Sequence, residues 1–118
     1  MIESIISMEL PAGGHLAIRR NRICPEQETK QCRRISLVSG IHGDELEGQY
    51  ICYETARRVK EHPEYLKGIV DIYPALNPLG IDMASRTVPR LEMDMNRMFP
   101  GDASGDMMER ITAAVVDS

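Results

Sequence analysis

Two short apolar runs, separated by a segment with helical periodicity, constrain the fold of this chain more than any other feature. The runs at 34–39 and 68–73 have the length of buried strands and are bounded by turn residues. Between them, Leu46, Tyr50 and Tyr53 recur at the spacing of one helical face. A strand, a helix and a second strand in this order form a right-handed crossover between parallel strands. We therefore expect an α/β fold with a mixed, partly parallel sheet.

The remaining segments add a hairpin before this unit and a loop and a helix after it. Residues 2–9 and 15–23 read as strands joined by a turn that contains proline and glycine, which predicts a β-hairpin. The stretch 74–103 is irregular and rich in proline, glycine and asparagine, and loops of that length are usually functional or disordered. Asp106, with Glu109 three residues later, forms a capping-box pattern, which predicts that a final helix begins here.

Composition and length limit the classes of protein to which the chain can belong. Its 118 residues suit one domain. A net charge of −4 with scattered arginines argues against a nucleic-acid partner, which needs a basic stripe. No apolar run is long enough to span a bilayer, so we expect no membrane partner. Three cysteines without tight spacing favour a reducing, cytoplasmic location over a disulfide framework.

A compact set of polar residues lies where the first apolar run ends and the helix begins. This is the carboxyl edge of a parallel sheet, where α/β proteins place their binding sites. His42 and Glu45 are three residues apart in one tight turn, so an imidazole nitrogen and a carboxylate oxygen can converge on one zinc ion. Asp44, with Glu47 three residues later, also resembles a capping box that begins the helix. The alternative to a metal site is that Glu45 is an ordinary residue of the first helical turn and Asp44 only its cap.

The long loop contains a second set of candidate residues. Arg86 and Arg97 are suited to bidentate capture of a carboxylate, because the planar guanidinium matches its geometry. Asn96 can add a neutral hydrogen-bond donor. Composition alone equally allows these arginines to be solvated surface residues.

Together the two sets resemble the succinylglutamate desuccinylase/aspartoacylase family. The chain reads Gly-Ile-His-Gly-Asp-Glu-x-x-Gly at 40–48 and Asn-Pro-x-Gly at 77–80, followed by Arg86 and by Asp-x-Asn-Arg-x-Phe-Pro-Gly at 94–101. The motifs occur in the order of the family, and the resemblance covers about residues 35–101. Because that family resembles the zinc carboxypeptidases in fold, the resemblance implies the N-terminal part of a carboxypeptidase-like α/β/α domain.

The resemblance implies a role for each residue of the motifs. His42 and Glu45 match the first two zinc ligands of the family. Arg86 matches the arginine that polarises the scissile carbonyl and stabilises the oxyanion. Asn96 and Arg97 match the pair that binds the carboxylate of the substrate.

The resemblance also implies an activity. Asp94 matches an acidic residue that supports the metal ligands or an arginine. Members of the family hydrolyse an N-acyl amino acid or a related amide in a zinc-dependent reaction, so we expect a small anionic substrate and a role in amino-acid metabolism. Two alternatives share part of the pattern: a zinc carboxypeptidase that acts on peptides, and a metal-free binding or structural domain that keeps the fold.

The chain is short for this family. The third zinc ligand is expected on a strand after the helix that begins near Asp106, and the general base further on. We therefore expect residues 1–118 to form the N-terminal portion of a single zinc-hydrolase domain, cut before the third ligand and inactive alone. Sheet and helix surfaces exposed by such a cut favour association into a homo-oligomer.

Overall fold

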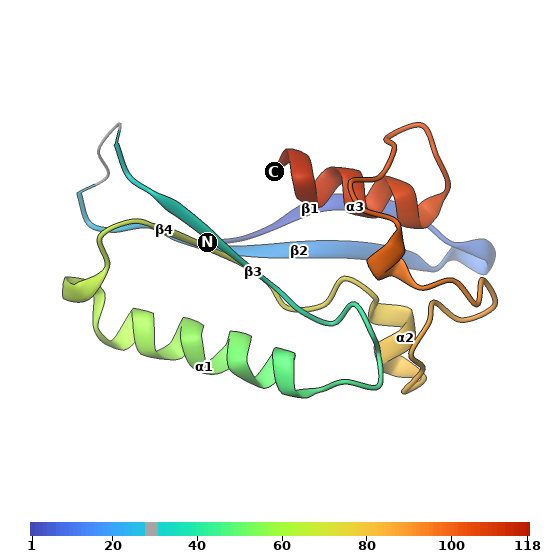
Figure 1. Ribbon diagram of the computed structural model, residues 1–118, viewed down its shortest axis with the longest axis horizontal. Helices are drawn as coiled ribbons and strands as arrows, with labels where there is room; N and C mark the ends of the chain where they lie inside the picture. The colour runs from blue at the N-terminus through green and yellow to red at the C-terminus, as the bar shows by residue number, and fades with distance from the viewer. Residues whose placement is uncertain (28–30) are drawn as a thin grey trace.

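In the part of the chain that the structure describes, four strands form one mixed sheet with helices on both sides (Figure 1). The computed structural model describes residues 1–27 and 31–118, and the strand order is β1–β2–β4–β3. The strands are β1 Ile2–Glu9, β2 His15–Ile23, β3 Arg34–Val38 and β4 Ile69–Tyr73. The helices are α1 Glu47–Glu61, α2 Pro78–Asp82 and α3 Met107–Asp117. None of the helices in these ranges is long and apolar enough to cross a membrane.

The crossover unit predicted from the sequence is confirmed. β3 and β4 are parallel neighbours, with Arg34 opposite Ile69 and Val38 opposite Tyr73, and α1 connects them. β1 and β2 form the predicted antiparallel hairpin, and β2 pairs antiparallel with β4, which makes the sheet mixed. α1 lies on one side of the sheet and α3 on the other, so the chain forms three layers (Figure 1).

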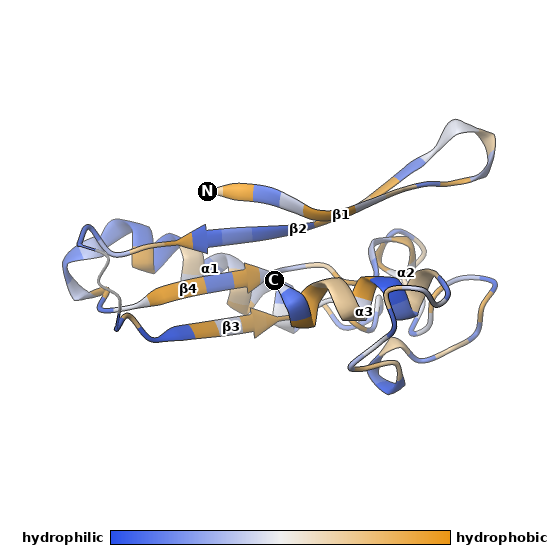
Figure 2. Ribbon diagram, turned by 90° about the horizontal axis from the view of Figure 1, so that it is seen from above, coloured by the Kyte–Doolittle hydropathy of each residue, from blue (hydrophilic) through white to orange (hydrophobic). Residues whose placement is uncertain are grey.

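Two apolar clusters hold the layers together, one on each face of the sheet. On the α1 side, Cys52 packs with Val70 and Ile72 of β4. The larger cluster lies on the α3 side and comprises Leu16, Ile18, Tyr73, Leu76, Val88, Met95, Met108 and Ile111. β4 therefore contributes to both clusters, as a strand buried on both faces does. Figure 2 shows hydrophobic stretches on β4, β3 and α3 beside a largely hydrophilic β2.

The start of α1 differs from the sequence expectation. The helix begins at Glu47 with Leu46 as its N-cap and no side-chain cap, so the capping box predicted at Asp44 is wrong. The preceding residues, up to Leu46, form turns and irregular backbone instead. The physical reason is that the backbone around Gly43 is hydrogen-bonded to a different part of the chain, at Ser85, which holds it away from a helical path.

The stretch 74–103 contains more regular structure than its composition indicates. Asn77 caps α2, because its Oδ1 accepts a hydrogen bond from Gly80 N at 2.9 Å. A single 3₁₀ turn, Met95–Arg97, follows later in the same stretch. The capping box predicted at the start of α3 is confirmed, with both of its hydrogen bonds formed.

A buried ion pair joins the central strands on the α3 side of the sheet. Asp71 of β4 is fully buried, and Arg22 of β2 donates to both of its carboxylate oxygens at 2.7 Å. Arg20 and Arg34 lie 3.9 and 3.8 Å from the same carboxylate. Burial by itself would raise the pKa of Asp71, but the three arginines lower it below its ordinary value. The carboxylate is therefore ionised and links β2, β3 and β4.

Asp71→Asn should lower the free energy of unfolding by about 1–3 kcal/mol, because it removes a buried, hydrogen-bonded charge that links Arg22, Arg20 and Arg34. Since the folded-state pKa of Asp71 is depressed, its contribution is fully present above the unfolded-state pKa and is lost as the pH falls through the folded-state value. Urea unfolding at neutral and acid pH measures both effects. Asp82→Asn, at an exposed position, is the matched control and should change stability little. Equal stability of Asp71→Asn and the parent at neutral pH would contradict this role.

Candidate active site

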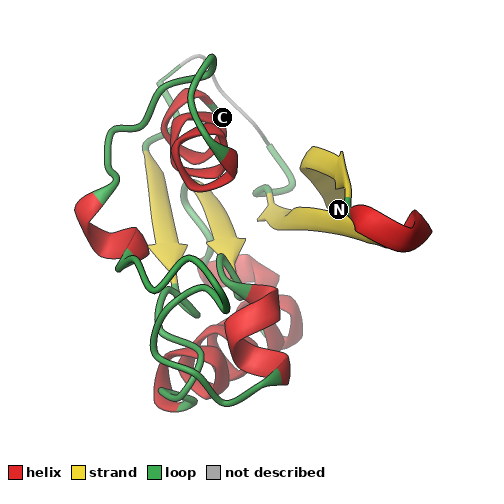
Figure 3. Ribbon diagram, turned by 90° about the vertical axis from the view of Figure 1, so that its right-hand side faces the viewer, coloured by secondary structure: helices red, strands yellow, loops and turns green. Residues whose placement is uncertain are grey.

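The candidate residues gather at one edge of the sheet. β3 and β4 are parallel, so both strands end at the same edge, and Figure 3 shows the loops that follow them lying together there. The loop after β3 carries His42 and Glu45, and the long loop after β4 carries Arg86, Asp94 and Asn96. Residues predicted from two separate motifs therefore meet at the carboxyl edge of the parallel strands.

Two glycines shape the turn that follows β3. Gly40 has φ +67°, a left-handed conformation that glycine adopts without steric cost. A Cβ atom on Gly43 would clash with the backbone of Gly80, so this close approach requires glycine. The backbone N–H of Gly43 also donates to Ser85 O at 2.9 Å. The turn is thus packed against the segment that leads directly to Arg86.

The imidazole of His42 lies between two carboxylates. Nε2 contacts Oδ1 of Asp94 at 3.0 Å, and Nδ1 lies 3.2 Å from Oε1 of Glu45. The hydrogen bond with Asp94, followed by a smaller effect of Glu45, raises the pKa of His42 above its ordinary value against the opposing effect of burial. The same bond lowers the pKa of Asp94, which is therefore ionised. An ionised carboxylate can only accept, so Nε2 is the donor.

The contact between His42 and Glu45 requires a positive charge. In a neutral imidazole that donates through Nε2, the other ring nitrogen carries a lone pair. At His42 that lone pair faces a carboxylate oxygen 3.2 Å away, so a proton or a metal ion is needed between them. Two ligands of a tetrahedral zinc ion, each at about 2.0–2.2 Å, are about 3.4 Å apart. The donors present, with a carboxylate on the second imidazole nitrogen, therefore fit zinc.

Arg86 adds a positive charge on the far side of the two carboxylates. Its Nη1 lies 3.3 Å from Oε1 of Glu45, and its Nη2 lies 3.7 Å from Oδ2 of Asp94. The side chains of Arg86 and Glu45 are 56% and 59% exposed, so neither is fixed by packing. The guanidinium can therefore exchange these partners for an oxygen atom of a ligand.

The turn that carries Asn96 and Arg97 is fixed to His42 through Asp94. Oδ1 of Asp94 accepts from Asn96 N at 3.0 Å as well as from His42, and Met95 is buried beneath the turn. Asn96 lines the same pocket as His42. Arg97 is exposed and is not among the residues that line this pocket in the described part of the chain. The structure thus brings Asn96 to the candidate site and leaves Arg97 outside this pocket.

The pocket at the end of β3 has a volume of about 310 Å³, which is at the lower limit for a small-molecule site. Sequence reasoning misses Glu47 as one of its residues, because it assigns that side chain to a helix cap. The sequence signal that could have identified Glu47 is its position at the start of a helix, two residues after Glu45. The residues that line the pocket are Val38, Ser39, Gly40, Ile41, His42, Glu45, Glu47, Gly48 and Asn96.

A third metal ligand is absent from the described residues. Within residues 1–27 and 31–118, no group of three histidine, cysteine, aspartate or glutamate side chains could hold a metal ion. His15 lies in the hairpin and His62 directly after α1, and both are exposed. Among the described residues, the candidate ligands are therefore His42 and Glu45.

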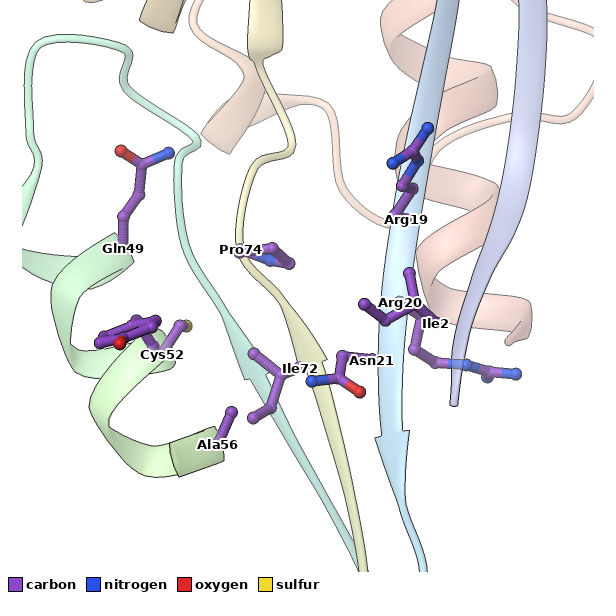
Figure 4. Close-up of a pocket in the computed structure, with 10 residues that line it drawn as sticks. Ile2, Arg19, Arg20, Asn21, Gln49, Cys52, Ala56, Ile72 and Pro74 are labelled. Atoms are coloured by element: carbon purple, nitrogen blue, oxygen red, sulfur yellow. The ribbon is translucent and has the colours of Figure 1, made fainter. Parts of the chain in front are cut away.

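A second pocket, of about 290 Å³, lies on the α1 side of the sheet (Figure 4). Figure 4 shows Cys52 and Ala56 of α1 on one side and Ile72 of β4 and Asn21 of β2 on the other. Asn21 has a buried Oδ1 atom without a hydrogen-bond partner among the described residues. None of the predicted catalytic or metal-binding residues lines this pocket, so we place the candidate active site at the end of β3.

Comparison with known families identifies the family to which the chain belongs. Residues 31–117 match the succinylglutamate desuccinylase/aspartoacylase catalytic domain. The matched range runs from just before β3 to the end of α3 and includes every candidate residue. The chain belongs to this family.

Individual relatives show the same similarity. An N-α-acetyl-L-2,4-diaminobutyric acid deacetylase from Halomonas elongata is 36% identical over 75 residues, which cover 64% of this chain and 21% of the deacetylase. A succinylglutamate desuccinylase/aspartoacylase from Rhodobacter sphaeroides is 32% identical with a TM-score of 0.70, over 86% of this chain and 29% of that one. The product-bound ectoine utilization protein EutE (DoeB) from Ruegeria pomeroyi is 28% identical with a TM-score of 0.73, over 92% and 32%. The chain thus spans about a third or less of each relative.

Asp94→Asn should lower the pKa of His42 towards its ordinary value, because the hydrogen bond with Asp94 is the largest cause of its elevation. NMR titration of the imidazole resonances in metal-free protein measures this change. As the pH rises, His42 should lose its proton earlier in the variant than in the parent. Asp117→Asn, an exposed carboxyl at the end of α3, should leave the titration of His42 unchanged. Identical curves for Asp94→Asn and the parent would disprove the contact.

Proposed function

We propose that this protein is a zinc-dependent hydrolase that removes the acyl group from an N-acyl amino acid. The observation that carries the proposal is the approach of His42 Nδ1 to Glu45 Oε1 at 3.2 Å, with Arg86 on the same carboxylate. Membership of the family supports it, as does similarity to relatives named as a deacetylase and as a desuccinylase/aspartoacylase. We also propose a cytoplasmic location and a role in amino-acid metabolism.

His42 and Glu45 would hold the zinc ion, and Asp94 would orient the imidazole from its Nε2 side. When bound, zinc supplies Lewis acidity towards a carbonyl oxygen and towards water. Asp94 and Glu45 stabilise positive charge at His42, so they would also stabilise a divalent cation bound at Nδ1. Because a catalytic zinc site has three protein ligands, the proposal requires a third ligand from outside the described residues.

Arg86 would stabilise the charge that develops on the carbonyl oxygen of the scissile amide. In the structure its guanidinium is held by Glu45 and Asp94, which keep it beside the candidate metal ligands. A preorganised cation at the position where an oxyanion forms lowers the barrier more than it strengthens ground-state binding. Arg86 therefore has a catalytic role in the proposal.

Asn96 and Arg97 would bind the carboxylate of the substrate. Asn96 lines the candidate pocket, and the Asp94 hydrogen bonds place its turn beside His42. Arg97 occupies the next position of the same 3₁₀ turn, and it is exposed. Two donors of this kind suit a small anionic N-acyl amino acid.

The proposal predicts different kinetic effects for the two arginines in the full-length protein. Arg86→Ala should lower kcat by about 10²–10³-fold, because its charge acts mainly in the transition state. Arg97→Ala should mainly raise KM, by about tenfold or more, because the substrate carboxylate is charged in the ground state and the transition state alike. Steady-state hydrolysis of a series of N-acyl amino acids measures both constants.

Arg110→Ala is the matched control, since it removes an exposed arginine from α3 and should leave both constants unchanged. Unaltered kinetics in both Arg86→Ala and Arg97→Ala would refute their assigned roles. Absence of hydrolysis by zinc-loaded full-length protein would instead favour a binding or structural domain.

The proposal also predicts the behaviour of residues 1–118 by themselves. They should bind zinc weakly and hydrolyse no N-acyl amino acid, because two ligands hold a zinc ion less well than three or four. Elemental analysis after dialysis, beside a hydrolysis assay, tests this. Light scattering on the same sample tests the expected association into a homo-oligomer. Stoichiometric, tightly bound zinc with turnover would show that these residues complete the site.

A further inference from the structure

The backbone of the turn that carries His42 is hydrogen-bonded to the segment 77–85. Gly40 O accepts from the backbone N–H of Asn77 at 2.8 Å, and Gly43 N donates to Ser85 O at 2.9 Å. Between these two bonds, Ile41 O accepts from Nδ2 of Asn77 at 3.3 Å. The backbone on both sides of His42 is therefore fixed by contacts from a segment about 40 residues further along the chain.

Asn77 uses both ends of its side-chain amide. Nδ2 donates to Ile41 O, and Oδ1 accepts from Gly80 N at 2.9 Å. The residue is only 2% exposed, so water does not replace either partner. A Cβ atom on Gly80 would clash with the amide, so this close approach requires glycine. The amide thus has one well-defined position.

We propose that Asn77 is a positioning residue for the candidate site. It holds the carbonyl of Ile41, and through this main-chain contact it holds the imidazole of His42 in register with Asp94 and Glu45. It does not touch a reacting atom itself. The inference rests on the proposed function for its catalytic consequence, but the placement of His42 follows from the hydrogen bonds alone.

The same segment also places Arg86. Ser85 O accepts from Gly43 N, and Ser85 N donates to Gly80 O at 2.8 Å, so Arg86 emerges from a backbone that is bonded to the turn of His42. A shift of this segment would move the candidate metal ligand and the candidate catalytic arginine together. Asn77 therefore couples the positions of residues from two different motifs.

Capping of α2 is the competing explanation for a buried asparagine here, and Asn77→Ser separates the two roles. Serine is as good an N-cap as asparagine, but its hydroxyl lies closer to the backbone than Nδ2 and does not extend to Ile41 O while it caps α2. Asn77→Asp is a second variant that keeps the capping oxygen and places a carboxylate oxygen against the same carbonyl. Asp106→Ala is the matched control, because it removes the side-chain cap of α3, far from the turn of His42 in sequence.

The experiment compares these variants in the full-length protein by two measurements. The first is the NMR spectrum of the His42 imidazole in metal-free protein, and the second is zinc affinity by competition with a chelating dye. Asn77→Ser and Asn77→Asp should both move the His42 resonances away from those of the parent, and should weaken zinc binding by about tenfold or more. Asp106→Ala should change neither measurement, even though it lowers thermal stability.

The two measurements distinguish failure of the inference from failure of the proposed function. Folded Asn77→Ser with the His42 resonances of the parent overturns the positioning role, whatever the zinc affinity. If Asn77→Ser does not fold, the same reading is taken from Asn77→Asp. If the parent binds no zinc, the proposed function fails, and shifted His42 resonances in the Asn77 variants still support the positioning role.

Discussion

Close packing of two loops at the carboxyl edge of the sheet determines the geometry of everything beyond that edge. Parallel pairing of β3 and β4 makes both strands end side by side, so the loops that follow them must share one space. The backbone of Gly43 lies directly against that of Gly80, and a side chain at Gly43 would force the loops apart. Because the loops are in backbone contact, side chains from either loop can reach the other, which allows His42 to meet Asp94.

Charge at the candidate site is arranged differently from charge in the core. Asp71 is fully buried and bound on two oxygens by Arg22, so it contributes to stability and cannot change partner. Glu45 and Arg86 are more than half exposed, and their contact at 3.3 Å is open to water. Exposed ion pairs contribute little stability, so exchanging one for a metal ion or a substrate costs little. The chain thus separates its structural charges from those available for binding.

Both the packing of the loops and the arrangement of charge act on His42. Its imidazole is largely buried, and its two nitrogens contact carboxylates from different loops. The loop packing fixes where the ring lies, and the carboxylates favour a positive charge next to it. The same carboxylate of Asp94 also accepts from the backbone of Asn96, so the candidate metal side and the candidate substrate side share one anchoring group.

Local patterns determined the strands and the capping box of α3, because each depends on neighbours within a few positions. The crossover followed from the order of these elements, and the motif residues were assigned by resemblance to a family. The Asn-Pro-x-Gly sequence also contained the cap and the first turn of α2, although irregular composition concealed them. Only the tertiary structure decided that α1 starts without a side-chain cap, that Asn77 reaches Ile41, and that Arg97 lies outside the pocket of His42. These outcomes depend on hydrogen bonds and packing between residues far apart in sequence, which form only after the sheet has brought the two loops together.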